Sequence, residues 1–160
     1  MASADTRTSP RVRAAARPIA AIRRVPWAIV GAVSAGGVVG AEARYAVGTM
    51  IHPSEGDFPW GTFTVNLSGC LLIGVLMVLI SDVWPSQRLL RPFLGTGVLG
   101  GYTTFSTYIV DIQRLVATGA ARTALAYLAA TVVGALLAVQ LGLSLTRLAI
   151  GRVHHRKESR

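Results

Sequence analysis

The sequence predicts an all-α integral membrane protein with four transmembrane helices. Hydrophobic residues make up 52% of the 160 residues, and the mean hydropathy of +0.52 is too high for an ordinary soluble domain. These residues fall in four blocks, each close to or longer than the roughly 20 residues that a helix needs to span a bilayer. Basic residues lie asymmetrically between and beyond the blocks. The predicted spans are residues 27–49, 60–80, 92–117 and 120–150.

The charge distribution predicts a fixed orientation in the cell membrane. The net charge is +9, and thirteen of the sixteen lysines and arginines precede the first span, separate the second from the third, or lie at or beyond the end of the fourth. By the positive-inside rule that side is cytoplasmic, so both termini of this multi-pass protein are expected there. The pattern favours anionic lipid head groups over nucleic acid as a partner. It divides the chain into a disordered basic cytoplasmic tail (1–26), a transmembrane domain (27–148) and a second basic cytoplasmic tail (149–160).

The first predicted span carries two ionisable residues, Glu42 and Arg44, near its outer end. Glu42 is expected at the membrane interface, where its carboxylate stays in water. Arg44 has two interpretations. Its side chain either extends to the interface in the same way, or turns inward and binds backbone carbonyls or attracts an anion at a vestibule.

The second predicted span contains Asn66, its most informative residue. A side-chain amide inside a membrane must find hydrogen-bond partners. Asn66 therefore either bonds to a neighbouring helix or serves as a donor that lines a pore.

The third predicted span is a poor continuous helix. Four glycines fall within residues 95–101, and a run of hydroxyl residues follows. Each glycine costs about 1 kcal/mol in a helix, and serine and threonine side chains compete for backbone partners. The sequence therefore predicts a break near residues 100–104, with freed carbonyls and hydroxyls that face a site. Breaks of this kind hold ions in membrane proteins.

The fourth predicted span places Tyr127 and Thr131 on one helix face, because they are four residues apart. The Thr131 hydroxyl either bonds back to its own helix or joins a polar track on that face. No carboxylate, histidine or lysine is expected at the membrane centre, which argues against a proton relay. The polar residues expected at bilayer depth are mostly neutral donors, which suit a small anion that must lose its water. They are Asn66, Ser68, Thr103, Thr104, Ser106, Thr107, Tyr127 and Thr131.

Three motifs lie in order along the first three predicted spans. They are Gly36-Gly37-x-x-Gly40-Ala41-x-x-Arg44-Tyr45, Gly61-Thr62-Phe63-x-Val65-Asn66-x-x-Gly69 and Gly97-x-x-Gly100-Gly101-x-Thr103-Thr104-Phe105-Ser106-Thr107. Together these motifs resemble those of one family, the Fluc (CrcB) fluoride channels. The resemblance covers about residues 27–148 and leaves the basic tails outside.

The resemblance implies a fluoride-selective channel that exports fluoride passively and lowers its cytoplasmic concentration. It implies an antiparallel, dual-topology dimer of two four-helix subunits, with a structural Na⁺ ion at the subunit interface. By motif position, the backbone carbonyls of Gly100 and Thr103 hold this ion, and Arg44 is a vestibule or structural residue. The implied fluoride pore is lined by Asn66, Phe105, Thr107, Tyr108, Tyr127 and Thr131.

Two residues depart from the family pattern. Tyr108 stands where phenylalanine is expected, which leaves open whether its hydroxyl joins or blocks the ion path. Ala135 stands one turn beyond Thr131, where the family often has another hydroxyl. Both departures bear on the conduction rate more than on the fold.

The charge bias also bears on whether the partner subunit is a second copy of this chain or a paralogue. An antiparallel homodimer needs one sequence that inserts in both orientations, which requires almost no bias. The strong bias here predicts a fixed orientation and hence an oppositely oriented, paralogous partner. An alternative function is a small four-helix proton-coupled multidrug exporter, for which Glu42 is the only candidate carboxylate in the first span. A third hypothesis is a membrane assembly protein or lipid-binding protein without transport activity. The sequence contains no recognisable set of catalytic residues that would indicate an enzyme.

Overall fold

The computed structural model describes residues 26–51, 56–84 and 86–158, with side chains as far as Arg152. All regular structure within these residues is helical. The predicted disordered tail lies outside them except for Pro26, whereas residues 149–158 of the second predicted tail continue the last helix. The α-helices are α1 (Trp27–Met50), α2 (Trp60–Val78), α3 (Gly100–Tyr102), α4 (Ser106–Ala117) and α5 (Ala121–Glu158), and two further segments, η1 (Leu79–Val83) and η2 (Arg91–Leu99), are π-helical.

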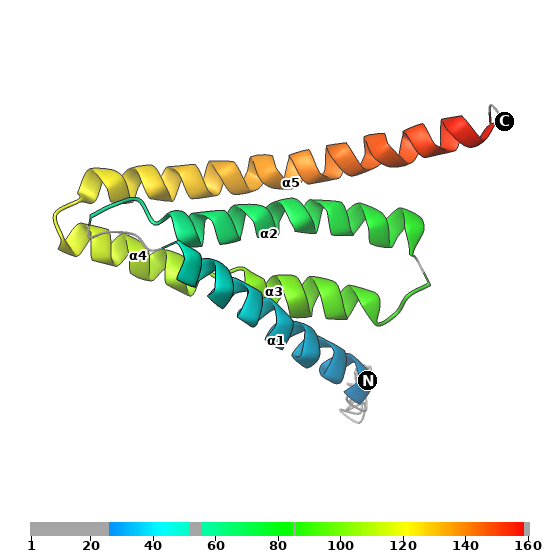
Figure 1. Cartoon of the computed structure of the whole chain (residues 1–160), viewed down its shortest axis with the longest axis horizontal. Coiled ribbons are helices and arrows are strands. Elements are labelled where there is room, and N and C mark those ends of the chain that lie inside the picture. Colours follow the sequence, from blue (N-terminus) through cyan, green and yellow to red (C-terminus); the bar gives the residue numbers. More distant parts are fainter. Residues whose placement is uncertain (1–25, 52–55, 85, 159–160) are drawn as a thin grey trace, which may run out of the picture.

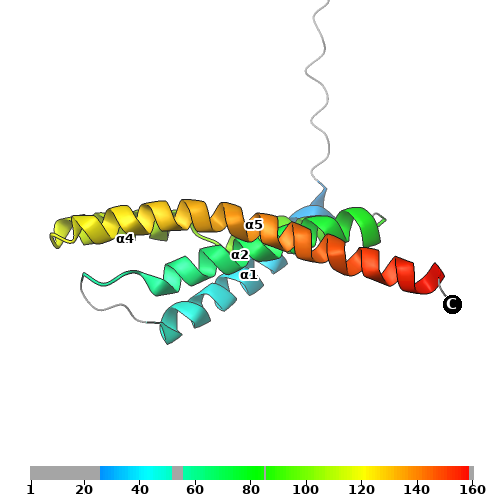
Figure 2. The same cartoon turned by 90° about the horizontal axis from the view of Figure 1, so that it is seen from above.

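The helices pack as two pairs. α5 runs alongside α2 in the same direction, while α1 lies across η2 and α3 (Figure 1). The short helix α4 lies beside the first half of α5, as the view from above also shows (Figure 2). The break between α3 and α4 therefore sits between the two pairs.

Glycines bring the paired helices into backbone contact. Gly74 of α2 faces Gly142 of α5, where a Cβ on Gly142 would lie 3.2 Å from the Gly74 Cα. Gly36 of α1 faces Gly97 of η2, where a Cβ on Gly97 would lie 2.9 Å from the Gly36 Cα. Small residues of this kind allow the close helix packing that stabilises membrane proteins, where apolar side chains gain little by leaving lipid.

The connection between α4 and α5 is a glycine-capped turn. Gly119 has a φ of 80°, which glycine adopts readily. The Gly119 N–H donates to the Val116 carbonyl (3.1 Å), and the Ala120 N–H donates to the Leu115 carbonyl (2.8 Å). These two bonds satisfy the last carbonyls of α4 and let α5 begin at once.

Among the described residues, two helices are long and apolar enough to cross a membrane. They are Trp60–Val83, with 24 residues, and Ala121–Arg152, with 32 residues. They correspond to the second and fourth predicted spans. The first predicted span forms α1, and the third is divided among η2, α3 and α4.

The helix break starts at Thr103, three residues later than the start that the sequence predicts. Gly100 and Gly101 are helical, whereas residues 103–105 are not, and Thr103 has an extended ψ of 157°. Gly101 packs against α1, where a Cβ on Gly101 would lie 3.1 Å from the Gly37 Cα, whereas Gly100 lines the groove described below. Gly101 thus serves close packing, and the hydroxyl residues that follow carry the break.

Candidate ion-binding site at the helix break

Asn66 holds the main chain at the break. Its Nδ2 donates to the Thr104 carbonyl (2.9 Å), and the Thr104 N–H donates to its Oδ1 (2.9 Å). The amide thus replaces the helical partners that Thr104 loses where the helix stops. One of the two sequence interpretations of Asn66 was a hydrogen bond to a neighbouring helical segment, and the structure contains such a bond. An amide nitrogen carries two hydrogens, so Nδ2 has one more to donate.

Thr104 also caps the start of α4. Its Oγ1 accepts a hydrogen bond from the Thr107 N–H (3.2 Å) and donates one to the Thr107 Oγ1 (3.0 Å). Side-chain oxygens before a helix commonly satisfy the free N–H groups of its first turn. The break is therefore a defined structure, with α2 on one side and α4 on the other.

The break leaves main-chain carbonyls without their helical donors. In a continuous helix the Thr104 N–H would donate to the Gly100 carbonyl, but here it donates to Asn66. No described residue donates a hydrogen bond to the Gly100 carbonyl. The Thr103 carbonyl accepts one from Arg44 Nη1 at 3.4 Å. Because a carbonyl oxygen has two lone pairs, both oxygens retain the capacity to bind a further electropositive group.

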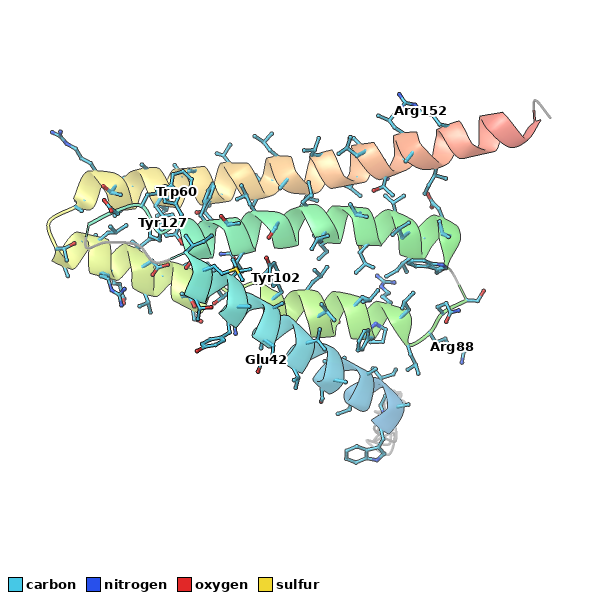
Figure 3. All side chains as sticks on the ribbon, in the orientation of Figure 1. Glu42, Trp60, Arg88, Tyr102, Tyr127 and Arg152 are labelled. Carbon is cyan, nitrogen blue, oxygen red and sulfur yellow. The ribbon has the colours of Figure 1, made fainter. Side chains whose placement is uncertain are left out.

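Arg44 therefore turns inward and binds a backbone carbonyl. This agrees with the second of the two interpretations that the sequence left open for Arg44. Its guanidinium ties α1 to the break and brings a positive charge to it. Glu42, on the same helix, is exposed and lies on the side of α1 that faces away from α2 (Figure 3). The two ionisable residues of α1 thus face different surroundings.

An open groove with a volume of about 560 Å³ runs along the break. Its wall is largely apolar and comes from α2, η2, the break, α4 and α5. Ala135, where the family pattern has a hydroxyl, is part of this wall. Of the residues predicted to bind ions, those that line the groove are Asn66, Gly100, Thr103, Phe105, Tyr108 and Thr131.

Phe105 and Tyr108 occupy different environments, although the sequence places them on one helix face. Phe105 lies in the break and is 76% exposed, whereas Tyr108 is 6% exposed. The Tyr108 hydroxyl donates to the Leu128 carbonyl of α5 (3.2 Å), so it is directed toward α5. Their ring centroids are 5.9 Å apart, with planes tilted by 46°. The exposed ring of Phe105 can contact another surface, whereas the ring of Tyr108 is buried and held by the hydrogen bond of its hydroxyl to α5.

Thr131 brings an unsatisfied hydroxyl to the groove. Its side chain is 7% exposed, and its Oγ1 has no hydrogen-bond partner among the described residues. One sequence interpretation was that the Thr131 hydroxyl bonds to a carbonyl of its own helix. No such hydrogen bond is present among the described residues. A buried hydroxyl without a partner costs about 1–3 kcal/mol, so this position favours a polar ligand.

Tyr127 and Thr107, the other two predicted pore residues, are not in the groove wall. Tyr127 is fully buried, with its ring centroid 5.1 Å from that of Tyr108 and 5.2 Å from that of Phe58. Thr107 takes part in the cap of α4. Tyr127 therefore packs against Tyr108, which does line the groove, whereas Thr107 is exposed at the start of α4.

Asp111 is a polar residue that the sequence analysis missed. Its Oδ2 accepts hydrogen bonds from the Thr62 hydroxyl (2.7 Å) and the Tyr127 hydroxyl (3.4 Å), which joins α2, α4 and α5. The available signal was its spacing of three from Tyr108 on α4, because residues three apart share a helix face. Its position near the end of the third span suggested solvent instead.

Comparison with known proteins assigns a family. The family described as "CrcB-like protein, Camphor Resistance (CrcB)" matches residues 31–143. The chain belongs to the CrcB family. The matched residues contain the whole break and groove of this CrcB-family chain, whereas the last fifteen residues of α5 lie beyond the match.

Named relatives support the assignment. A Streptomyces avermitilis protein named Fluoride-specific ion channel FluC 2 is 58% identical over 124 residues, which cover 75% of this chain and 75% of that protein. A Nocardia farcinica protein of the same name is 52% identical over 124 residues, covering 78% and 89%. A second Streptomyces avermitilis protein, named Fluoride-specific ion channel FluC 3, is 40% identical over 129 residues, covering 81% and 63%.

Proposed function

We propose that this CrcB-family chain is a subunit of a fluoride-selective channel through which fluoride leaves the cytoplasm passively. The observation that carries the proposal is that relatives 58% and 52% identical over most of the chain are named fluoride-specific ion channels. The groove supports it, because its polar groups are neutral donors in a largely apolar wall. Fluoride is small and strongly hydrated, so its path has to supply close donors in place of water.

In this proposal the groove residues contact fluoride directly. The second N–H of Asn66 and the unpaired hydroxyl of Thr131 donate hydrogen bonds to the ion. The rings of Phe105 and Tyr108 present their electropositive edges. Thr107 and Tyr127 act indirectly, through the cap of α4 and through the packing behind Tyr108.

We also propose a structural Na⁺ ion at the break, held by the carbonyls of Gly100 and Thr103. Carbonyl oxygens suit a hard cation, and the Gly100 carbonyl lacks a hydrogen-bond donor among the described residues. When bound, Na⁺ supplies positive potential in a low-dielectric region close to the anion path. Arg44 holds the Thr103 carbonyl in place and adds a positive charge of its own.

A second subunit, in antiparallel orientation, would cover the open side of the groove. The exposed ring of Phe105 and the apolar wall favour a protein surface there over water. The charge bias favours a paralogous partner over a homodimer. The two numbered relatives in Streptomyces avermitilis support this, because such pairs of paralogues exist within one organism.

The proposed topology has four spans and both termini in the cytoplasm. α1 begins and α5 ends at the same end of the molecule (Figure 1), and Arg88 and Arg152 lie at that end (Figure 3). Trp60, at the start of α2, lies at the opposite end. Tryptophan favours membrane interfaces, and basic residues favour the cytoplasmic side.

Fluoride efflux from proteoliposomes tests the proposal. The chain is reconstituted alone and with a paralogous partner, and a fluoride electrode records efflux, with chloride as the control anion. Fluoride efflux without chloride efflux supports the channel, and efflux from the chain alone removes the need for a partner. Folded protein that conducts no fluoride in either arrangement contradicts the proposal.

The exporter alternative is not favoured. It requires a carboxylate that alternates between a proton and a substrate inside the membrane domain. Glu42 is exposed and is not part of the groove wall.

A further inference from the structure

The last helix extends beyond the helix that it packs against. Gly74 of α2 lies beside Gly142 of α5, and the two helices run in the same direction. Ten residues further along the chain from these glycines are Trp84, where the helical structure that continues α2 has ended, and Arg152, which is still within α5. α5 continues as a helix to Glu158, about 9 Å farther at 1.5 Å per residue. This extension is also outside the residues that match the family.

Exposed arginines gather at that end of the molecule. We call Arg88 and Arg91, beside the connection between η1 and η2, and Arg147 and Arg152, on α5, the basic collar. All four side chains are exposed, and Figure 3 shows Arg88 and Arg152 at the same end. Asp82 is an exposed carboxylate at this end. Arg156 and Lys157 add two more basic residues to the end of α5.

Two exposed tryptophans lie at the same end of the molecule as the basic collar. Trp84 follows η1, and Trp27 opens α1 at the same end of the molecule; both side chains are exposed. Indole rings favour the boundary between hydrocarbon and lipid head groups. In a bilayer, the collar is therefore expected at the depth of the head groups.

We propose that the basic collar binds the phosphodiester groups of anionic phospholipids. A guanidinium donates two parallel hydrogen bonds to a phosphate, and a basic side chain near an anionic membrane surface gains binding free energy from it. The tryptophans favour lipid over nucleic acid, because only a lipid surface also offers hydrocarbon for exposed indole rings. The proposal does not depend on fluoride conduction.

Titration of the purified, delipidated chain with lipid tests this inference. Dioleoylphosphatidylglycerol and dioleoylphosphatidylcholine are added separately in mixed micelles, and the bound lipid is counted by native mass spectrometry. We expect preferential binding of the glycerol lipid. The variant R147Q/R152Q should lose that preference by roughly fivefold for each arginine. The matched control R114Q/R122Q, which removes two exposed arginines from the opposite end, should keep it.

Two further measurements test whether the binding is electrostatic and whether the ligand is a lipid or another source of phosphate. Raising the salt from low to high concentration should weaken binding of the glycerol lipid to the unmodified chain, because exposed charges are screened. At matched ionic strength, inorganic phosphate or an oligonucleotide should not displace the lipid. Equal binding of both lipids, equal loss in the two double variants, no effect of salt, or displacement by phosphate or oligonucleotide would overturn the proposal.

Discussion

The side-chain amide of Asn66 forms two hydrogen bonds with the main chain of Thr104, one in each direction and each 2.9 Å long. This pairing joins α2 to the point where the third helical segment stops. It satisfies the N–H and the carbonyl of Thr104, while the Gly100 carbonyl has no hydrogen-bond donor among the described residues. The amide of Asn66 thus stabilises the main chain at the break.

Replacement of Asn66 by alanine should destabilise the protein and abolish fluoride efflux. The substitution strands the N–H and the carbonyl of Thr104, at a cost of about 1–3 kcal/mol for each buried group. Thermal unfolding in detergent and efflux from proteoliposomes measure the two effects. Thr64→Ala, at an exposed position of the same helix, is the control. An Asn66→Ala protein with normal melting temperature and normal efflux contradicts this account.

Tyr108→Phe should lower stability by about 1 kcal/mol and leave fluoride efflux within a few-fold of normal. The hydroxyl binds the Leu128 carbonyl, so its loss removes a hydrogen bond between α4 and α5 but no ligand of the ion. Tyr45→Phe, at an exposed tyrosine of α1, controls for the change in polarity. A large fall or rise in efflux without a change in melting temperature places the hydroxyl in the ion path instead.

Gly142→Ala should be strongly destabilising. The new Cβ would meet the Leu71 carbonyl and would lie 3.1 Å from the Val75 nitrogen, so α2 and α5 must separate. The added methyl group at Gly48 meets nothing within 4 Å, so Gly48→Ala should be neutral or stabilise the helix by up to about 1 kcal/mol. The comparison is made by melting temperature in detergent. Equal melting temperatures for the two variants would mean that the close contact is not needed.

Asp111→Ala should destabilise the protein more than Asp111→Asn. Alanine leaves the hydroxyls of Thr62 and Tyr127 without their shared acceptor, whereas asparagine keeps an acceptor oxygen. Because Tyr127 is fully buried, its hydroxyl has little access to water. Melting temperatures of the two variants, with Thr62→Val as a third, test the cluster. If alanine and asparagine behave alike, the hydrogen bonds to Asp111 contribute nothing measurable.

Glu42→Gln should leave fluoride efflux unchanged across the pH range in which a carboxylate titrates. Glu42 is exposed and is absent from the groove wall. Efflux with and without a proton gradient measures the effect. Loss of proton-driven transport in this variant would instead revive the exporter alternative.

The sequence predicts helix positions well, because composition and local signals determine them. α1 begins directly after Pro26 and α2 directly after Pro59, where the apolar blocks also start. The exact start of the break was not predictable from local propensity. Gly100 and Gly101 are poor helix formers, yet both are helical, and Gly101 packs against Gly37 of α1, which is a tertiary contact.

The candidate site was predictable in residue type more than in arrangement. Asn66, Thr131, Phe105 and Tyr108 do come together on one groove. The sequence did not reveal that Tyr127 lies behind Tyr108, nor that Asp111 bonds to two hydroxyls, because both depend on how α4 packs against α5. The partner of Asn66 was likewise unknown until the break was located.

The pairing of Asn66 with Thr104 also constrains biosynthesis. The third segment leaves the ribosome after α2 and carries backbone groups at residues 103–105 that its own helices do not satisfy. Each such group costs several kcal/mol in hydrocarbon, so this segment is poorly suited to enter lipid by itself. In the proposed four-span topology this segment would have to enter the bilayer together with α2, whose Asn66 amide satisfies the N–H and the carbonyl of Thr104. Insertion of the third span would then be cooperative with α2, and the yield of integrated chain would depend on a residue outside the segment being inserted.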